Sequence, residues 1–313
     1  MLNIQTQEVQ NWDEISRSGT LSHDFINENS DHLNWNLLVK AQFLPVELLE
    51  QNKNKIDWVF LSAWGKLTDE HYDKFKDQLN WVEIAEHQKL SETIMRKYAD
   101  ILSWSVISEV QEMSESFMMQ FADKLNWEEV SWAKKLSETF IEKYADRLDW
   151  ECVSQFQKLS ESFIEKAFNR LNITTVCFTQ NLSEAFIEKH ADRLDWKAIS
   201  KRQTLSEAFI EKHANQVDWE NICLNQKLSE KFIVKHSDKV NWPILSRRLD
   251  LSEDYIERHV DKWDWLSISR YQKLSESFIE KYADRVNWKL IGLNQELSDG
   301  FITKHYIRMI SSP

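Results

Sequence analysis

Residues that interrupt regular secondary structure are scarce in this chain. Its 313 residues include only four glycines and three prolines. Glycine and proline mark turns and linkers, so their scarcity favours one continuous helical domain without a flexible linker. Length alone would suggest two domains, whereas the unbroken repeat described below argues for one.

Other absences concern cysteine and long hydrophobic runs. The three cysteines, Cys152, Cys177 and Cys223, are an odd number and lie inside repeats, so we expect no disulfide framework and a reducing compartment. No stretch approaches 18 apolar residues, which predicts no membrane span. The N-terminal segment has neither a basic region nor an apolar run, which predicts no signal peptide. We therefore expect a cytoplasmic protein that does not bind membranes.

What the sequence does contain is a 23-residue unit, repeated from Leu21 to Pro313 without insertion or deletion. The clearest copies begin at Leu136, Leu182 and Leu274. A fixed short period is typical of a stacked repeat array, so we look for function on a long surface and not in a buried pocket. We number the places of the unit 1 to 23 from its leading Leu.

Each unit predicts two helices. Ser at place 2 and Glu at place 3 predict an N-cap and a first-turn carboxylate. Apolar places 5, 6, 9, 10 and 13 then trace one face of a helix of roughly 11 residues. Asp or Asn at place 14 predicts the N-cap of a second helix of roughly 8 residues. Three Asn–Glu pairs predict capping boxes, namely Asn11 with Glu14, Asn80 with Glu83 and Asn126 with Glu129.

Such a hairpin is too small to bury its own apolar face, so neighbouring units must supply the core. We therefore expect an all-α fold, a right-handed α-solenoid of about thirteen stacked 23-residue hairpins. We expect one domain, 1–313, with 1–20 as an N-terminal cap half-repeat, 21–296 as twelve full repeats and 297–313 as a C-terminal capping helix. The protein is predicted to be a monomer, with weak self-association possible through apolar residues of the last helix.

Two further columns of residues are predicted to be structural. Gln at place 22 predicts an inter-repeat amide ladder. Trp at place 15 would fill the seam between repeats, with its indole N–H paired to backbone. The tryptophans are Trp12, Trp35, Trp58, Trp81, Trp104, Trp127, Trp150, Trp196, Trp219, Trp242, Trp265 and Trp288.

Histidine at place 9 raises the question of a metal site. The column contains His190, His213, His236, His259 and His305, where other units have Tyr. Metal ligands lie close together on adjacent turns or strands. Since each His replaces a Tyr in one packed column, we predict half-buried, hydrogen-bonded histidines, and no metal or cofactor.

The places of the second helix that vary most are 16, 17, 20 and 21, and we expect them to face outward on the concave side of the stack. Random drift on a solvated face is the alternative. Their charge changes sign along the chain, which indicates a partner-binding surface. Its acidic half is predicted to contain Glu83, Glu86, Glu109, Glu128, Glu129, Trp132, Glu151 and Phe156. Its basic half is predicted to contain Lys197, Lys201, Arg202, Arg247, Arg248, Arg270, Tyr271 and Lys289.

The sign changes at an irregular unit, 159–181. Ile173 replaces its Trp, and the usual Tyr-Ala pair is inverted to Ala167-Phe168. Compensated repacking is one interpretation, and a hinge or partner pocket is the other. The first helix, by contrast, repeats Glu at places 3 and 7, Asp at 11 and Lys or Arg at 8 and 12, which predicts a salt-bridged convex face.

The unit LSExFIEKYADRLDW followed by xxISxxQ resembles the short helical-hairpin repeats of proteins from large DNA viruses and bacteriophages. The resemblance covers nearly the whole chain. It implies an α-solenoid and a viral origin, and a phage origin would favour the blocking of a host defence factor. It carries no catalytic residue over.

The chain shows no Ser/His/Asp set, Gly-rich phosphate loop or clustered metal signature, so we expect no enzyme and no catalytic residue. The favoured function is protein–protein binding, as an inhibitor of a host defence protein. One alternative is binding of nucleic acid or nucleotide phosphate by the basic half. Another is imitation of nucleic acid by the acidic surface.

Overall fold

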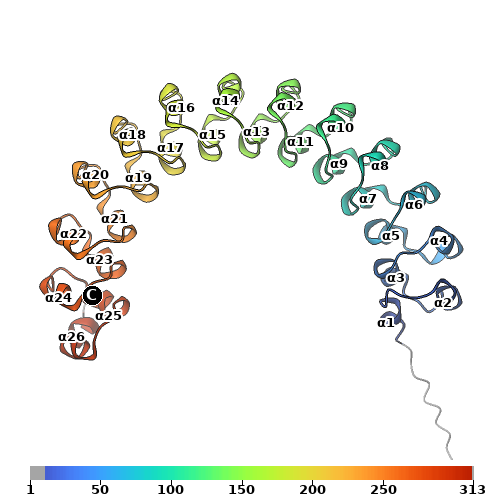
Figure 1. The fold of residues 1–313 in the computed structure, drawn as a ribbon. Helices are drawn as coiled ribbons and strands as arrows, with labels where there is room; N and C mark the ends of the chain where they lie inside the picture. Colours follow the sequence, from blue (N-terminus) through green and yellow to red (C-terminus); the bar gives the residue numbers. More distant parts are fainter. Residues whose placement is uncertain (1–10, 312–313) are drawn as a thin grey trace, which may run out of the picture. The chain divides into compact units, whose positions relative to one another are not determined.

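The computed structural model describes residues 11–311, and these are all-helical apart from short turns and loops (Figure 1). The chain divides into two compact units, Met1–Gln157 and Lys158–Pro313. The 23-residue repeat continues across this division. The predicted single domain therefore stays a prediction, and so does the right-handed twist of the solenoid. Parts of the two predicted ends, 1–10 and 312–313, lie outside the described residues.

In the first unit, odd-numbered helices alternate with even-numbered helices. The odd-numbered ones are α1 (Trp12–Ser16), α3 (Trp35–Ala41), α5 (Trp58–Trp64), α7 (Trp81–His87), α9 (Trp104–Val110), α11 (Trp127–Ala133) and α13 (Trp150–Phe156). The even-numbered ones are α2 (His23–Glu28), α4 (Val46–Gln51), α6 (Asp69–Lys74), α8 (Glu92–Lys97), α10 (Glu115–Gln120) and α12 (Glu138–Lys143), with a 3₁₀ turn, η1, at Lys53–Lys55.

The second unit continues the alternation. Its odd-numbered helices are α15 (Ile173–Thr179), α17 (Trp196–Arg202), α19 (Trp219–Asn225), α21 (Trp242–Arg248), α23 (Trp265–Tyr271) and α25 (Trp288–Asn294). Its even-numbered helices are α14 (Glu161–Ala167), α16 (Glu184–Lys189), α18 (Glu207–Lys212), α20 (Glu230–Lys235), α22 (Glu253–Arg258), α24 (Glu276–Lys281) and α26 (Asp299–Ser311).

Within each unit, successive odd-numbered helices contact one another and form the inner of two rows (Figure 1). The even-numbered helices form the outer row. This arrangement confirms the all-α repeat stack, an α-solenoid. The last helix, α26, exposes Tyr306, Ile307 and Ile310, whereas Met309, which we also expected to be uncovered, is partly buried. Self-association through this helix stays a prediction.

The predicted helix starts are confirmed, but the first helix of each unit is shorter than predicted. In the unit from Leu136, Phe140 N donates to Ser137 Oγ at 3.2 Å, and Cys152 N donates to Asp149 Oδ1 at 2.9 Å. Helix α12 has 6 residues and ends before Tyr144, which has φ −112° and ψ 25°.

Two hydrogen bonds turn the chain between the two helices of the unit. The carbonyl of Ala145 accepts from Trp150 Nε1 at 2.7 Å, and Asp149 N donates to Ser131 Oγ of the preceding repeat at 2.9 Å. A helix that ran on through place 14 would need that carbonyl and that N–H for each other. The side chains of places 15 and 19 therefore replace the backbone bond and turn the chain.

The same serine bond shows that two predicted capping boxes are wrong. Asn80 N donates to Ser62 Oγ at 2.8 Å, and Asn126 N donates to Ser108 Oγ at 2.9 Å. Glu83 and Glu129 are therefore not the acceptors for these N–H groups, although Asn80 and Asn126 do cap their helices with their own side chains.

Serine at place 19 is a link between repeats that the sequence analysis missed. Ser200 Oγ donates to Trp196 O at 2.7 Å and accepts from Asp218 N of the next repeat at 2.9 Å. Cysteine substitutes at the same place, since Asn241 N donates to Cys223 Sγ at 3.2 Å. The same pair of bonds is made by Ser16, Ser62, Ser108, Ser131, Ser246 and Ser269.

The tryptophan column packs between repeats as predicted. Trp219 Nε1 donates to Ala214 O at 2.9 Å, and its ring contacts Phe232 and His236 of the next repeat, with centroids at 6.2 and 5.2 Å. The corresponding N–H bond is made by Trp35, Trp58, Trp81, Trp104, Trp127, Trp150, Trp196, Trp242, Trp265 and Trp288.

The glutamine ladder is also confirmed, and its bonds run to backbone groups. Gln226 Oε1 accepts from Leu205 N at 3.0 Å, while its Nε2 donates to Gln203 O at 2.7 Å. Gln157, Gln203, Gln272 and Gln295 make the equivalent contacts.

Three of the five histidines of this column, His190, His213 and His305, are hydrogen-bonded to the preceding repeat, whereas His259 Nε2 lies 3.9 Å from Glu230 Oε1. His213 Nε2 lies 2.7 Å from Glu188 Oε2, and His190 Nε2 lies 3.0 Å from Glu165 Oε1. The prediction is wrong for His236, whose buried Nε2 has no partner among the described residues. Across residues 11–311, no group of three His, Cys, Asp or Glu side chains is placed to hold a metal ion.

Cations of the outer row pair with the preceding repeat, as predicted. Lys212 Nζ lies 2.9 Å from Glu188 Oε1, and Arg147 Nη2 lies 2.7 Å from Asp123 Oδ1. Hydrogen bonds from His213 and Lys212 hold the pKa of Glu188 below its usual range.

In the irregular unit, a large residue is buried one position later than usual. Phe168 is buried in place of the usual Ala, and its ring lies 5.2 Å from that of His190. The Arg193 guanidinium lies 3.9 Å from the Phe168 centroid. This is the compensated repacking that one of the two interpretations predicted.

Candidate binding surface

Three of the four places predicted to face outward do so. Places 16, 20 and 21 are mostly exposed along the inner row of each unit. Place 17 was wrongly predicted to be exposed. Ala198 and Ile244 are buried there, and Glu83 and Glu129 are half-buried. Successive inner helices contact one another, and Ala198 and Ile244 belong to the buried core between the elements.

The inner row of the first unit combines carboxylates with exposed apolar side chains. Glu86, Glu109, Glu128 and Glu151 are exposed as predicted. Glu83 Oε2 instead lies 3.3 Å from His87 Nε2, and Glu129 Oε2 is buried with no hydrogen-bond partner within the described part of the chain.

Apolar residues at places 20 and 21 cross this acidic surface. Trp132 is 41% exposed and Phe156 is 53% exposed, which agrees with their predicted place on the surface. Trp64 is exposed on the same row, with its ring 5.0 Å from that of His87 and Lys40 Nζ 5.0 Å from its centroid. The inner row of the first unit therefore presents exposed apolar side chains among carboxylates.

In the second unit, the predicted basic residues gather in two places. Lys197 and Lys201 line a depression over α15, α17 and α19, which also contains Phe178 and Glu220. Lys201 Nζ lies 5.5 Å from the Phe178 centroid. Arg202 is hydrogen-bonded to α15, because its Nε donates to Phe178 O at 3.2 Å.

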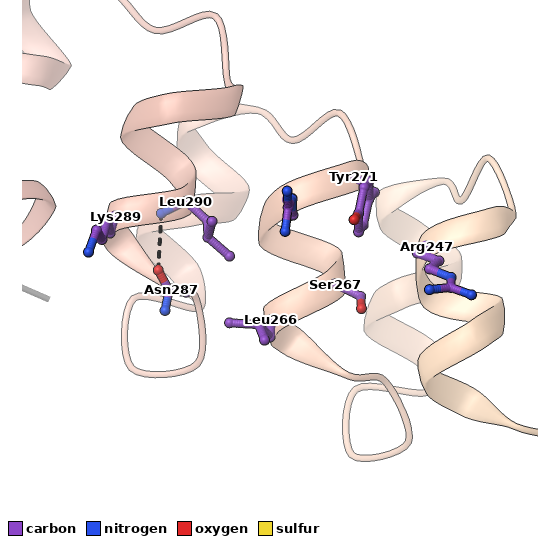
Figure 2. Close-up of a pocket in the computed structure, with 8 residues that line it drawn as sticks. Arg247, Leu266, Ser267, Tyr271, Asn287, Lys289 and Leu290 are labelled. Atoms are coloured by element: carbon purple, nitrogen blue, oxygen red, sulfur yellow. Dashed lines mark hydrogen bonds between the residues drawn. The ribbon is translucent and has the colours of Figure 1, made fainter. Parts of the chain in front are cut away.

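The second place is a groove across α21, α23 and α25, which we call the α23 groove (Figure 2). It contains four of the predicted residues, Arg247, Arg270, Tyr271 and Lys289. The Arg270 guanidinium lies 5.3 Å from the Tyr271 centroid. The groove has a volume of about 380 Å³, and the remaining lining residues are Leu266, Ser267, Asn287 and Leu290.

The cations of this surface differ from outer-row cations such as Lys212 and Arg147 in having no carboxylate partner. Lys212 and Arg147 of the outer row lie within salt-bridge distance of acids on the preceding repeat. Within residues 11–311 no such pair involves Lys197, Lys201, Arg202, Arg247, Arg270 or Lys289. Their positive charge is therefore available to an external ligand.

Arg248 has a structural role that the sequence analysis did not foresee. Its Nη1 donates to Cys223 O at 2.9 Å and to Gln226 O at 2.7 Å. These are the backbone acceptors that a glutamine at place 22 would use, and Leu249 occupies that place here. Arg248 therefore replaces the missing rung of the ladder, which makes it a poor candidate for partner contact.

No protein family, curated protein or solved structure matches this chain. Over residues 11–311, none of the helices combines the length and apolar character needed to cross a bilayer. The surface must therefore be interpreted from its own chemistry.

The sequence analysis missed half of the residues that line the α23 groove. Leu266 occupies place 16 and could have been predicted, because this place was expected to be exposed. Ser267 and Leu290 occupy place 17, and Asn287 is an N-cap at place 14. Place 17 was predicted to face outward but is mostly half-buried or buried, and place 14 caps helices, so only the three-dimensional arrangement shows that these residues border a groove.

Proposed function

We propose that this chain is a non-enzymatic protein-binding module that engages its partner through the inner rows of its two units. The observation that carries the proposal is the contrast in pairing. Outer-row cations such as Lys212 are matched by acids of the neighbouring repeat. Inner-row cations of the second unit lie together without such acids, and an acidic partner surface would supply them.

The apolar residues of the inner rows support the same proposal. Tyr271 is 50% exposed beside Arg270, and Trp64, Trp132 and Phe156 are exposed on the first unit. Tyr, Trp and Arg are enriched at the energetic centres of protein interfaces. Isolated exposed apolar residues are ordinary, whereas these recur at places 20 and 21 of one row.

A second candidate is the binding of nucleic acid or nucleotide phosphate by the basic row. The absence of any carboxylate among the residues that line the α23 groove favours it. The net charge of −12 and the acidic row of the first unit oppose it, because long-range repulsion would disfavour a polyanion. We therefore place protein binding first.

The kind of partner follows only from the resemblance to viral and phage repeats. On that basis we propose a host protein as the partner, with a defence factor as the favoured class and the cytoplasm as the place of encounter. Neither the basic nor the acidic row identifies such a protein by its chemistry alone.

Three variants test the proposal. The groove variant carries Arg247→Glu, Arg270→Glu and Lys289→Glu, and the acidic-row variant carries Glu86→Lys, Glu109→Lys and Glu128→Lys. The control variant carries Lys227→Glu, Lys231→Glu and Lys262→Glu, three exposed lysines of the second unit outside the odd-numbered helices. It matches the charge change of the groove variant.

The measurement is an affinity pull-down from host lysate, with and without nuclease, followed by mass spectrometry. We expect wild type and the control variant to retain the same protein, and at least one inner-row variant to lose it. Retention that is abolished by nuclease would favour the second candidate. Retention by all three variants, or no retained protein, would contradict the proposed function.

A further inference from the structure

We infer that the α23 groove binds an extended acidic peptide segment in which carboxylates recur about every third residue. The inference rests on the proposed protein-binding function and specifies the partner segment that the second unit recognises. It starts from three cations, Arg247, Arg270 and Lys289, which α21, α23 and α25 bring to one groove.

The placement of these cations selects an extended ligand over a compact one. Figure 2 shows Arg247 on one side of the α23 helix and Lys289 on the other, with Ser267 between them. Each cation comes from a different helix, and packed helices lie roughly 8–10 Å apart. A chain that crosses the row of helices can contact the three cations one after another, each at its own helix.

The helix spacing also sets the spacing of the anions. An extended peptide advances about 3.3 Å per residue, so about three residues cover the distance between neighbouring helices. Carboxylates at every third position would each meet one cation of the row. Arg247 and Arg270 can each hold a carboxylate with two parallel N–H bonds, while Lys289 supplies a single point charge.

The uncharged lining residues fit the rest of a peptide. Leu266 is 57% exposed and Tyr271 is 50% exposed, so they offer apolar contact to a side chain that lies between two carboxylates. Asn287 Oδ1 accepts from Leu290 N at 3.0 Å, which leaves its amide Nδ2 as a donor. This Nδ2 and the Ser267 hydroxyl can donate to peptide carbonyls.

A nucleic-acid strand would use the same cations but leave these features unexplained. The one aromatic ring among the residues that line the groove is Tyr271, and sequence-tolerant binding of single strands uses several aromatic platforms on which successive bases stack. Apolar Leu266 and Leu290 suit an aliphatic side chain better than a base. The peptide is therefore the occupant that the groove favours.

The test measures fluorescence anisotropy of labelled probes against the full chain. One nine-residue peptide carries Asp at its first, fourth and seventh positions, with Leu, Phe and Ser elsewhere. A second peptide has the same composition with its three Asp residues adjacent. A single-stranded thymidine oligonucleotide is the third probe. Thermal unfolding of the groove and control variants verifies that both remain folded.

We expect the spaced peptide to bind about tenfold more tightly than the clustered one. The groove variant should lose this binding and the control variant should keep it. Equal binding of the two peptides, no binding of either, or a preference for the oligonucleotide would overturn the inference. If the groove variant nonetheless loses the protein captured in the pull-down, the proposed function stands and only the peptide pattern fails.

Discussion

One hydroxyl group, that of Ser200, joins two repeats. It donates to Trp196 O and accepts from Asp218 N, so it contacts the first residue of its own helix and the N-cap residue of α19. Side chains this small are usually regarded as spacers, but this one satisfies a backbone N–H that the chain reversal leaves without a helical partner. Single side chains such as Ser200 therefore determine much of how one repeat docks against the next.

Ser200→Ala should destabilise the protein by about 1–3 kcal/mol, because it leaves the Asp218 N–H without its acceptor. Ser200→Cys should recover most of that loss, since Cys223 fills the same place and accepts from Asn241 N at 3.2 Å. Chemical denaturation of both variants checks this. Equal loss in the two would show that volume, and not the hydrogen bond, is what place 19 requires.

A second residue-scale prediction separates structural from surface tryptophans. Trp219→Ala should cost about 3 kcal/mol, because the ring contacts Phe232 and His236 and its N–H is bonded to Ala214. Trp64→Ala is the matched control, since that ring is 48% exposed on the inner row. Thermal melts should show a marked drop for the first variant and little change for the second; the reverse order would contradict the assignment of place 15 to the core.

At the scale of elements, the glutamine ladder fixes how each hairpin joins the one before it. Where glutamine is missing, a cation takes over. Arg248 does so beside Leu249, and Lys134 occupies place 22 itself, with its Nζ donating to Glu109 O and Gln111 O at 2.8 and 2.7 Å. The acceptors are backbone carbonyls, so any donor of suitable reach can serve.

Lys134 makes its own contribution dependent on pH. Burial lowers the pKa of Lys134 to about 8, from 10.5. Between these values the unfolded chain binds more protons than the folded chain, so the free energy of unfolding should rise as pH increases from about 8 to 10.5. Lys134→Gln should remove this rise and stabilise the protein at pH 7 by about 1 kcal/mol, after allowance for solvent screening.

Denaturation at pH 7 and pH 10 measures the effect, with Lys135→Gln as the control because that neighbouring lysine is exposed. A glutamine introduced at place 22 of this repeat would also be able to accept from the N–H at place 1, as Gln157 does from Leu136 at 3.0 Å. An unchanged pH dependence in the Lys134 variant would show that its amine stays charged in the folded state.

The caps, the tryptophan seam and the ladder could be predicted because each uses one residue type at a constant place. The turn between the two helices could not, since it depends on Trp150 and Ser131, which lie five and eighteen residues from the groups they bind. The α23 groove was not predicted, but four of its lining residues were, among them Arg247 and Arg270, because their places were expected to be exposed. The role of Arg248 was missed because it depends on the residue beside it.

At the scale of the whole molecule, every strong contact described above joins a repeat to itself or to its immediate neighbour. Stability in such an array is close to a sum of repeat and interface terms, so a local defect should stay local. This has a functional consequence. The inner rows of the two units carry surfaces of different character, and damage to one unit should leave the surface of the other intact.

Hydrogen exchange of Trp219→Ala tests this locality. Trp219 belongs to the repeat 205–227 and contacts the next one through Phe232 and His236. Amide exchange should therefore accelerate within about 182–250, while amides of 11–157 keep the protection they have in the wild type. An acceleration of similar size in both units would show that the array opens as one cooperative body. In that case the groove variant and the acidic-row variant could not be interpreted as independent probes of two surfaces.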